Sequence, residues 1–476
     1  MSTAYEPVIG LEIHVQLQTR TKMFCGCELS FGEPPNTRTC PVCLGLPGAL
    51  PVANARAIHY ALMIGLALGC AIADRSIFHR KNYFYPDLPK GYQISQYDEP
   101  LCRGGALAGV RLHRVHVEED AAKLIHVGES GRIHGSEQSV VDFNRGGTPL
   151  VEIVTEPELH SAEHAREWLT LLRATIRSLG VSDVNMDEGS LRADANVSLR
   201  PLGSSELGTK TELKNMNSFR FLERGVDAEI ARQSAILAAG EEVDQETLHF
   251  DPASGVITSL RSKEEAQDYR YFPEPDLVPI ATTAEMLADA RTAIGELPSA
   301  RAERFASDYG LSAESAHTIA FRDELARYFE AVVLAAGGEH GQQVANWLSQ
   351  LVARIGDADP GASKVTAEAF AALVVLVATR ELTAGAAREV LDVLVERGGD
   401  VQAIVAEHDL ATLAGDDDGL AAVVAGAIAA DADAAEKVRA GNEKAIGALI
   451  GSVMRETRGR ADGAEVTRLI RGQLGV

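Results

Sequence analysis

The clearest strand pattern in the chain is Val8-Ile9-Gly10-Leu11-Glu12-Ile13-His14-Val15. The same alternation of apolar with other side chains recurs in Ala193-Asp194-Ala195-Asn196-Val197-Ser198-Leu199. Successive side chains of a strand point to opposite faces, so this alternation is typical of a sheet with one apolar and one polar face. Two amphipathic helices are predicted among the strands, over 161–179 and 218–239, each ending at a glycine. We therefore expect residues 1–290 to form a large α+β cradle domain with a mainly antiparallel sheet.

The composition changes after Pro298, where alanine and leucine dominate and helical periodicity continues to the end of the sequence. We expect an all-helical domain over 291–405 and a small helical tail domain over 406–476. The boundary is predicted at the solvated turn Gly415-Asp416-Asp417-Asp418-Gly419. Residues 437–476 hold eight Lys or Arg against four acidic residues, whereas 401–436 hold eight acidic residues and neither Lys nor Arg. The tail is thus the best candidate for an RNA-facing surface, the alternative being solvated helix faces.

The formal net charge of −23 argues against broad nucleic-acid binding, because phosphate binding needs a positive surface. A local basic patch remains compatible with one RNA partner. No apolar run approaches the about 20 residues of a membrane span, and the first residues lack the pattern of a signal peptide. A cytoplasmic protein without membrane contact is expected.

Four of the six cysteines fall close together, as Cys25, Cys27, Cys40 and Cys43. Two close pairs with a short loop between them suit tetrahedral zinc, which needs four converging soft ligands. Since a closed four-cysteine site leaves no position for substrate, we predict a structural zinc site. The alternative is four buried free thiols in a tight loop.

Acidic and basic side chains share strand faces elsewhere in the first part. Glu12 and His14 are two apart in one strand, which suggests a Mg²⁺ site, general acid/base catalysis or simply an exposed sheet face. Similar faces are predicted around Glu119 and Glu152, around Asp194, and at Lys210 with Lys214. Several polar strand faces side by side would give the sheet an open polar cleft. Acids that bind Mg²⁺ and lysines that bind phosphate would make that cleft a nucleotide-binding site. The sequence has no Walker-type loop, dinucleotide fingerprint or Gly-x-Ser-x-Gly elbow.

Several longer strings are distinctive together. They are Val8-Ile9-Gly10-Leu11-Glu12-Ile13-His14, Arg80-Lys81-Asn82-Tyr83-Phe84-Tyr85-Pro86-Asp87-Leu88-Pro89-Lys90-Gly91-Tyr92-Gln93-Ile94-Ser95-Gln96, Asp142-Phe143-Asn144-Arg145-Gly146-Gly147-Thr148-Pro149-Leu150-Val151-Glu152 and Asp268-Tyr269-Arg270-Tyr271-Phe272-Pro273-Glu274-Pro275-Asp276. With them the chain resembles the B subunits of the aspartyl/glutamyl-tRNA(Asn/Gln) amidotransferases, densely to about residue 280 and more loosely beyond. It is more similar to the bacterial and organellar members than to the archaeal tRNA-Gln-specific relative, because no synthetase-like insertion is visible.

The resemblance implies an ATP-dependent ligase that phosphorylates the side-chain carboxylate of Glu-tRNA(Gln) or Asp-tRNA(Asn). An A subunit, the glutaminase, would supply ammonia, and a C subunit would complete a heterotrimer. The resemblance gives Glu12, His14, Glu119 and Glu152 roles in binding Mg²⁺ and ATP, with Asp194 as a further ligand. Lys81, Lys210 and Lys214 are our candidates for phosphate contact. The tRNA-binding candidates in the tail are Lys437, Arg439, Lys444, Arg455, Arg458 and Arg460. The alternatives are a non-catalytic, zinc-containing tRNA-binding scaffold and a scaffold whose partner carries the kinase chemistry.

Overall fold

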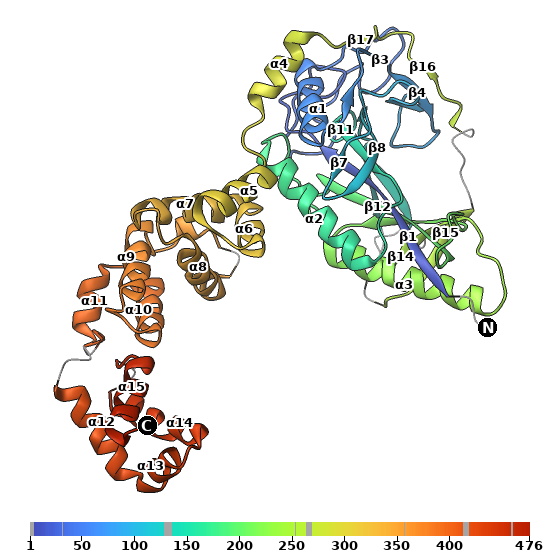
Figure 1. The fold of residues 1–476 in the computed structure, drawn as a ribbon. Coiled ribbons are helices and arrows are strands. Elements are labelled where there is room, and N and C mark those ends of the chain that lie inside the picture. The colour runs from blue at the N-terminus through green and yellow to red at the C-terminus, as the bar shows by residue number, and fades with distance from the viewer. Residues whose placement is uncertain are drawn as a thin grey trace. The chain divides into compact units, whose positions relative to one another are not determined.

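The computed structural model describes residues 4–30, 32–127, 136–252, 254–262, 269–356, 358–412, 418–457 and 460–476. The chain divides into two compact units, one ending at Leu297 and the other beginning at Pro298. In the described ranges the first unit holds all the strands and the second is helical (Figure 1). The fold class is α+β, as the sequence predicted.

A ten-stranded sheet forms the centre of the first unit (Figure 1). Its strands are, in spatial order, β15 (Ile257–Ser262), β14 (Glu246–Phe250), β13 (Thr211–Met216), β12 (Leu191–Pro201), β1 (Tyr5–Gln16), β11 (Pro149–Thr155), β8 (Val110–Glu119), β6 (Cys102–Arg103) and β2 (Ala71–Ile72), with β7 (Ala106–Leu107) paired to β8. Its described neighbours pair antiparallel except β13 and β14, which are parallel. The expectation of a mainly antiparallel sheet is therefore confirmed.

Shorter strands pair outside this sheet. They are β9 (Lys123–Val127) with β10 (Gln138–Asp142), β16 (Phe272–Pro273) with β4 (His79–Asn82) and β5 (Tyr92–Ser95), and β17 (Ile280–Ala281) with β3 (Arg75–Ser76). The pairings of β16 and β17 bring residues 272–281 against strands that lie about 200 positions earlier in the chain.

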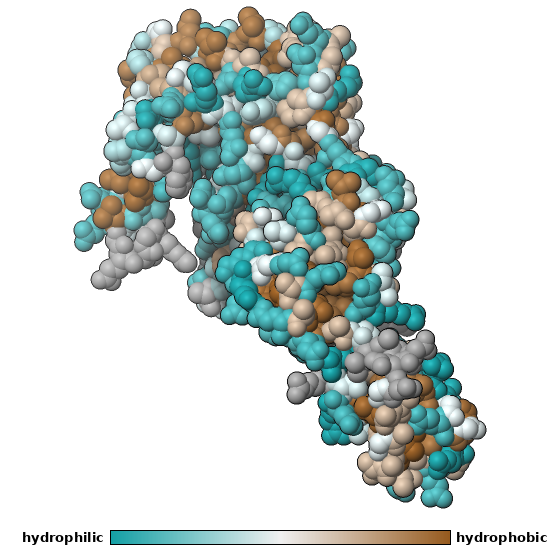
Figure 2. All heavy atoms as spheres, turned by 90° about the vertical axis from the view of Figure 1, so that its left-hand side faces the viewer, coloured by the Kyte–Doolittle hydropathy of each residue, from teal (hydrophilic) through white to brown (hydrophobic). Residues whose placement is uncertain are grey.

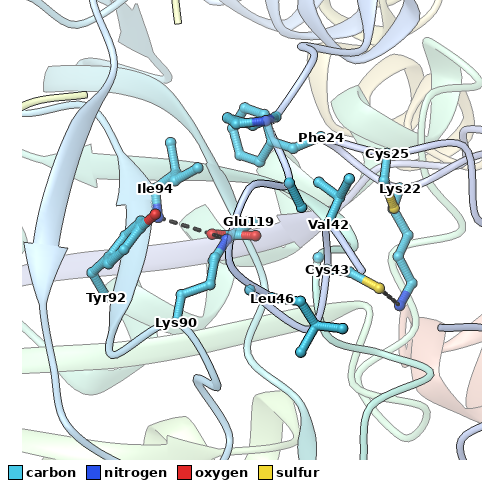
Figure 3. A pocket seen from close by; sticks show the side chains of 14 residues that line it. Lys22, Phe24, Cys25, Val42, Cys43, Leu46, Lys90, Tyr92, Ile94 and Glu119 are labelled. Carbon is cyan, nitrogen blue, oxygen red and sulfur yellow. Dashed lines mark hydrogen bonds and ion pairs between the residues drawn. The ribbon is translucent and has the colours of Figure 1, made fainter. Parts of the chain in front are cut away.

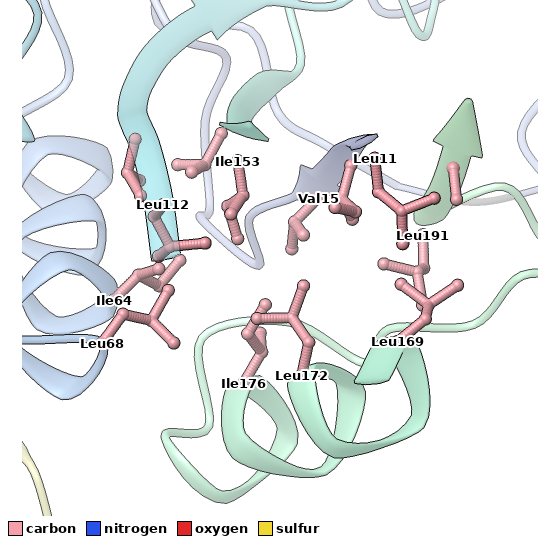
Figure 4. Close-up of a cluster of buried hydrophobic side chains, with 14 of the residues drawn as sticks. Leu11, Val15, Ile64, Leu68, Leu112, Ile153, Leu169, Leu172, Ile176 and Leu191 are labelled. Carbon is pink, nitrogen blue, oxygen red and sulfur yellow. The ribbon is translucent and has the colours of Figure 1, made fainter. Parts of the chain in front are cut away.

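The large sheet has one apolar and one polar face. On β1, Leu11, Ile13 and Val15 are buried in the main core, whereas Glu12 and His14 point to the other side. Helices α2 (Ala162–Ser178) and α3 (Phe219–Ala238) cover the apolar face, and Figure 4 shows leucine and isoleucine side chains of α2 meeting those of the sheet. Truncating one such leucine to alanine typically costs about 2–5 kcal/mol. This packing fixes which residues of each strand face the opposite, polar side.

Both predicted helices are confirmed to within one residue at each end. Ser161 and Ser218 cap them, each accepting a hydrogen bond from a backbone N–H of the first turn. Gly180, with φ of +66°, follows α2 and adopts the left-handed conformation that ends many helices.

A third helix, α1 (Ala55–Ala67), was not predicted. Its sequence is apolar almost all round, and it packs into the same core as the sheet and beside α4 (Ala284–Ala293). A helix buried on several sides lacks the polar stripe that makes amphipathic periodicity visible in a sequence.

Among its described residues, the second unit contains two hydrophobic clusters. The first draws on residues 305–410, from α5 (Pro298–Tyr309), α6 (Ala313–Ala320), α7 (Asp323–Ala335), α8 (Gly341–Ile355), α9 (Ala367–Ala378), α10 (Ala384–Arg397) and α11 (Val401–Glu407). The second draws on residues 420–474, from α12 (Asp418–Ala430), α13 (Ala432–Arg439), α14 (Ile446–Glu456) and α15 (Gly463–Leu474). Most of the predicted boundary turn at 415–419 lies outside the described residues.

Hydrophilic and hydrophobic side chains are interspersed over the face of the molecule drawn in Figure 2. Of the helices that the structure describes, none combines the length and the apolar character needed to cross a membrane.

Candidate active site and cysteine cluster

The polar face of the sheet gathers charged side chains from neighbouring strands. His14 on β1 lies opposite Glu152 on β11 and opposite Arg192 on β12. Glu12 lies opposite Asp194 in the same way. These pairings come from the strand register, so residues far apart in the sequence become cross-strand neighbours.

Three of these side chains converge on one point. The imidazole Nε2 of His14 is 3.6 Å from Glu152 Oε2 and 3.8 Å from Glu118 Oε1. Each of the three residues offers a ligand atom, and these atoms lie within 4.8 Å of one another. His116 reaches the same two carboxylates, at 3.5 Å from Glu118 and 3.4 Å from Glu152. We call His14, Glu118 and Glu152 the triad.

Burial and mutual contact shape the charge of the triad. Burial opposes the charged imidazolium of His14, but the hydrogen bond and charge of Glu152 outweigh it and raise the pKa of His14 to about 9. Burial also opposes ionisation of Glu152, yet the charges of His116 and His14 hold its pKa well below the usual value. The carboxylates of Glu118 and Glu152 therefore remain ionised beside the His14 imidazolium.

Two carboxylates with one imidazole suit a divalent cation. The carboxylate oxygens are the hard donors that Mg²⁺ prefers, while the imidazole is a less usual ligand for it. Glu12, expected as a further Mg²⁺ ligand, is not among the residues whose ligand atoms converge. Its Oε1 accepts a hydrogen bond of 2.9 Å from Asn196. Burial, followed by the charge of Glu152, raises the pKa of Glu12. Neighbouring acids therefore repel one another on this part of the face, and the donor set of the triad fits a bound metal ion.

Glu119 does not join the triad, contrary to our expectation. Its carboxylate forms an ion pair with Lys90 and accepts a hydrogen bond of 3.0 Å from the backbone of Ile94. These groups and Phe24 line a cavity of about 140 Å³ that also reaches Cys43. Figure 3 shows their side chains. The acid from β8 that belongs to the triad is instead Glu118, which also accepts a hydrogen bond of 2.8 Å from the Ser95 hydroxyl.

The strand alternation explains the difference. Along β8, Glu119 points to the same side as Val115 and Val117, which are buried in the main core. Glu118 points to the other side, together with His116. Glu118 could therefore have been chosen from the sequence, by extending the alternation of β8 to its last two residues.

A cleft of about 700 Å³ opens beside the triad. Lys81, Asp194 and Lys214 line it together with His14 and Glu118. The Nζ of Lys81 lies 4.7 Å from the centre of the Tyr269 ring. Lys214 Nζ lies 3.0 Å from Asp194 and 2.6 Å from Glu212. Lys210 is exposed just before β13 and does not line the cleft.

Two further residues of the cleft were not predicted as site residues, Asp120 and Arg192. Asp120 is buried and lies 2.9 Å from an Nη of Arg192, 3.8 Å from Arg145 and 2.7 Å from the Gln16 amide nitrogen. Burial opposes ionisation of Asp120, but the charges of Arg192 and Arg145 lower its pKa. Arg192 precedes Asp194 by two residues on β12, so both side chains point to the same face. This spacing is the sequence pattern from which Arg192 could have been predicted as a site residue.

The four clustered cysteines converge as predicted. Cys25, Cys27, Cys40 and Cys43 place their sulfur atoms within 4.8 Å of one another, a donor set that fits tetrahedral zinc. Hydrogen bonding with Cys25 lowers the pKa of Cys43 to about 4, while the same contact raises the pKa of Cys25.

The cysteine loop is tied to the segment that precedes β11. Asn36 donates its side-chain amide to Val141 O at 3.0 Å, and Asn144 donates to Pro34 O at 2.8 Å. The buried Lys22 donates to Phe143 O at 2.9 Å and lies 3.7 Å from Cys43 Sγ (Figure 3). A metal held by the cysteines would therefore stiffen the loop that leads into the strand carrying Glu152.

The basic residues predicted for the tail differ in their surroundings. Lys437 pairs with Asp433 at 2.6 Å and Arg460 with Asp409 at 2.7 Å. Three of the predicted residues are exposed and form no ion pair with any described residue: Arg439, Lys444 and Arg455. Arg458 lies outside the described residues.

Comparison with known proteins gives matches to both parts of the chain. Residues 7–288 match the family model of the GatB/GatE catalytic domain, and residues 327–474 match that of the GatB domain. The B subunit of the aspartyl/glutamyl-tRNA(Asn/Gln) amidotransferase from Frankia casuarinae is 50% identical, covering 99% of this chain and 96% of that protein. Proteins of the same name are 49% identical in Thermobifida fusca, over 99% of this chain and 94% of theirs, and 47% identical in Anaeromyxobacter sp. (strain K), over 99% of both.

Proposed function

The chain belongs to the family of aspartyl/glutamyl-tRNA amidotransferase B subunits, and on that premise we propose that its cleft activates the side-chain carboxylate of a misacylated tRNA with ATP. The substrate is Glu-tRNA(Gln), Asp-tRNA(Asn) or both. A phosphoryl group is transferred from ATP to the carboxylate, and ammonia then displaces phosphate to leave the amide. The chain is thus one subunit of a carbon–nitrogen ligase that takes its nitrogen from glutamine.

The observation that carries this proposal is the triad at the edge of a cleft lined by cations. His14, Glu118 and Glu152 gather ligand atoms within 4.8 Å, and the adjoining cleft has room for a nucleotide. In this proposal the three residues hold Mg²⁺, and Glu12 and Asp194 stand beside them on the same face. Bound Mg²⁺ supplies the positive charge that neutralises the phosphate oxygens during transfer.

Lysines of the cleft are proposed to meet the phosphates. Lys81 and Lys214 line it, and Lys214 is held in place by Asp194 and Glu212. Phosphoryl transfer depends on positioning and on electrostatic stabilisation rather than on a protein nucleophile. A lysine fixed by two carboxylates has lost most of its side-chain freedom before substrate arrives, which favours such positioning.

The remaining features receive separate roles in the proposal. The cysteine cluster holds a structural zinc, and the basic tail contacts tRNA. Ammonia comes from a glutaminase A subunit, and a C subunit completes the heterotrimer, which acts in the cytoplasm. A shielded path for ammonia keeps it unprotonated and protects the acyl phosphate from water.

The second candidate function is a non-catalytic, zinc-containing tRNA-binding scaffold. It accounts for the cysteines and the basic tail. It gives no reason for a cluster of buried carboxylates and histidines, because burying such groups is costly unless they are paired or bind a cation.

The experiment is ATP-dependent amidation of misacylated tRNA by the reconstituted complex, with ADP and product measured together. Glu152→Gln keeps the shape of the side chain and removes its charge, so activity should fall on the order of 10²-fold. The matched control is Glu158→Gln, a partly exposed acid paired with Arg111 away from the cleft, which should stay near wild type. Full activity of Glu152→Gln would favour the scaffold.

A further inference from the structure

Arg192 is the one arginine among the described residues that line the cleft, and little of its hydrogen-bonding capacity is used. A guanidinium carries five N–H donors. Asp120 is the one carboxylate paired with Arg192 among the described residues, and the Nε of Arg192 has no hydrogen-bond partner. The side chain is 36% exposed and lines the cleft.

Arg145, the neighbouring arginine, shows the contrast. It donates to the backbone oxygens of Ala121 and Ala122 at 2.9 and 2.8 Å and also approaches Asp120. Those contacts explain Arg145 as a structural tie between two loops. No comparable set of backbone acceptors surrounds Arg192 among the described residues.

The position of Arg192 places it between the two charged groups of the proposed site. In the sheet, Arg192 lies opposite His14 of the triad. Asp194, which pairs with Lys214, is two residues further along β12. The charges of Asp120, Asp194 and Glu118 all raise the pKa of Arg192. The guanidinium is therefore close to the triad on one side and to the Lys214 pair on the other.

We propose that Arg192 is a catalytic residue that binds the phosphoryl group during its transfer, and that Asp120 is the positioning residue that holds it there. The inference rests on the proposed function of the cleft. A planar guanidinium matches two phosphate oxygens at once, which a lysine ammonium does not.

The step balances without any further reactant. An oxygen of the substrate carboxylate attacks the γ-phosphorus of ATP, and a new O–P bond forms. The bond from that phosphorus to the β–γ bridging oxygen breaks, and its electron pair leaves with ADP. Arg192 stays protonated throughout and donates hydrogen bonds to the non-bridging oxygens, where negative charge is held in the transition state.

The test is single-turnover formation of ADP by the reconstituted complex, in the presence of misacylated tRNA and without an ammonia source. Arg192→Lys keeps the positive charge beside Asp120, so it preserves folding while removing the planar fork. We expect the rate to fall about 10²-fold with little change in tRNA affinity. Arg200→Lys is the matched control, because Arg200 lies on the same strand and pairs with Glu6 at 2.6 Å. It should remain within about twofold.

Two further variants separate catalysis from structure. Added guanidinium should restore part of the activity of Arg192→Ala, which a purely structural arginine would not allow. Asp120→Asn should lower kcat while leaving the KM for ATP nearly unchanged, because it disturbs the orientation of Arg192. An Arg192→Lys complex as fast as wild type, or an Arg192→Ala complex that folds but is not rescued, would overturn the inference. A wild-type complex that forms no ADP would instead refute the proposed function itself.

Discussion

Glu118 and Glu119 are adjacent in the sequence, yet their carboxylates lie on opposite faces of β8 and belong to different sites. Glu118 is 3.8 Å from His14 and belongs to the triad, while Glu119 pairs with Lys90 in the cavity beside the cysteine cluster. Strand geometry alone produces this separation, because consecutive side chains point in opposite directions. The two acids should therefore have different functions.

The first prediction compares these two acids directly. Glu118→Gln should lower tRNA-dependent ADP formation on the order of 10²-fold, because it removes a charged donor of the triad. Glu119→Gln should retain ADP formation within a few-fold, because its carboxylate faces away from the cleft. The two variants are isosteric changes one residue apart, so each is the control for the other. Equal loss in both, or loss in Glu119→Gln alone, would contradict the assignment.

The sequence predicted the fold well where burial is one-sided. The alternation in 8–15 and 193–199 fixed which side chains share a face, and α2 and α3 followed from an apolar stripe and a capping serine. It failed for α1, because a helix buried on several sides has no such stripe.

The site was harder to predict, because it depends on the register between strands and on which charged side chains pair with one another. Which residue stands opposite His14 depends on how three strands align, and no local pattern encodes that alignment. Lys210 and Lys214 belong to one alternating strand pattern. Of the two, Lys214 forms an ion pair with Asp194 and lines the cleft, whereas Lys210 does not line it. The convergence of the four cysteines was predictable because their spacing itself specifies a ligand set.

The second prediction concerns the cysteine cluster. Purified wild-type protein should contain one zinc ion per chain, and Cys40→Ser/Cys43→Ser should contain almost none, because two of the four ligands are lost. The measurement is elemental analysis after removal of loosely bound metal. Cys70→Ser is the control, since Cys70 is buried apart from the cluster. Unchanged zinc in the double variant would disprove the site.

The third prediction is a pH dependence of stability in the metal-free protein. Burial lowers the pKa of His14 but Glu152 and Glu118 raise it more, from 6.5 to about 9. A raised folded-state pKa stabilises the fold fully below pH 6.5, and this contribution disappears as the pH rises towards about 9. Wild type should therefore lose more thermal stability between these limits than His14→Gln.

The control for this measurement is His160→Gln, because His160 is exposed and contacts a backbone oxygen at 3.0 Å rather than the triad. Its stability should follow that of wild type across the range. Parallel pH profiles for wild type and His14→Gln would show that the His14 charge is not coupled to the two carboxylates.

The fourth prediction assigns tRNA contact to the tail residues that have no acidic partner. Arg439, Lys444 and Arg455 are exposed and unpaired among the described residues, whereas Lys437 and Arg460 already face acids. Replacing the three unpaired residues with Gln should weaken tRNA binding by the complex and reduce the slope of log K against log salt by about one per lost phosphate contact.

The control is Lys437→Gln/Arg460→Gln, which should change the tRNA affinity and the salt slope less, because those charges are partly neutralised before tRNA binds. Exposed substitutions of this kind usually alter stability by no more than about 0.5 kcal/mol, so a loss of affinity would reflect binding rather than folding. An unchanged salt slope in the triple variant would place the tRNA contact elsewhere on the molecule.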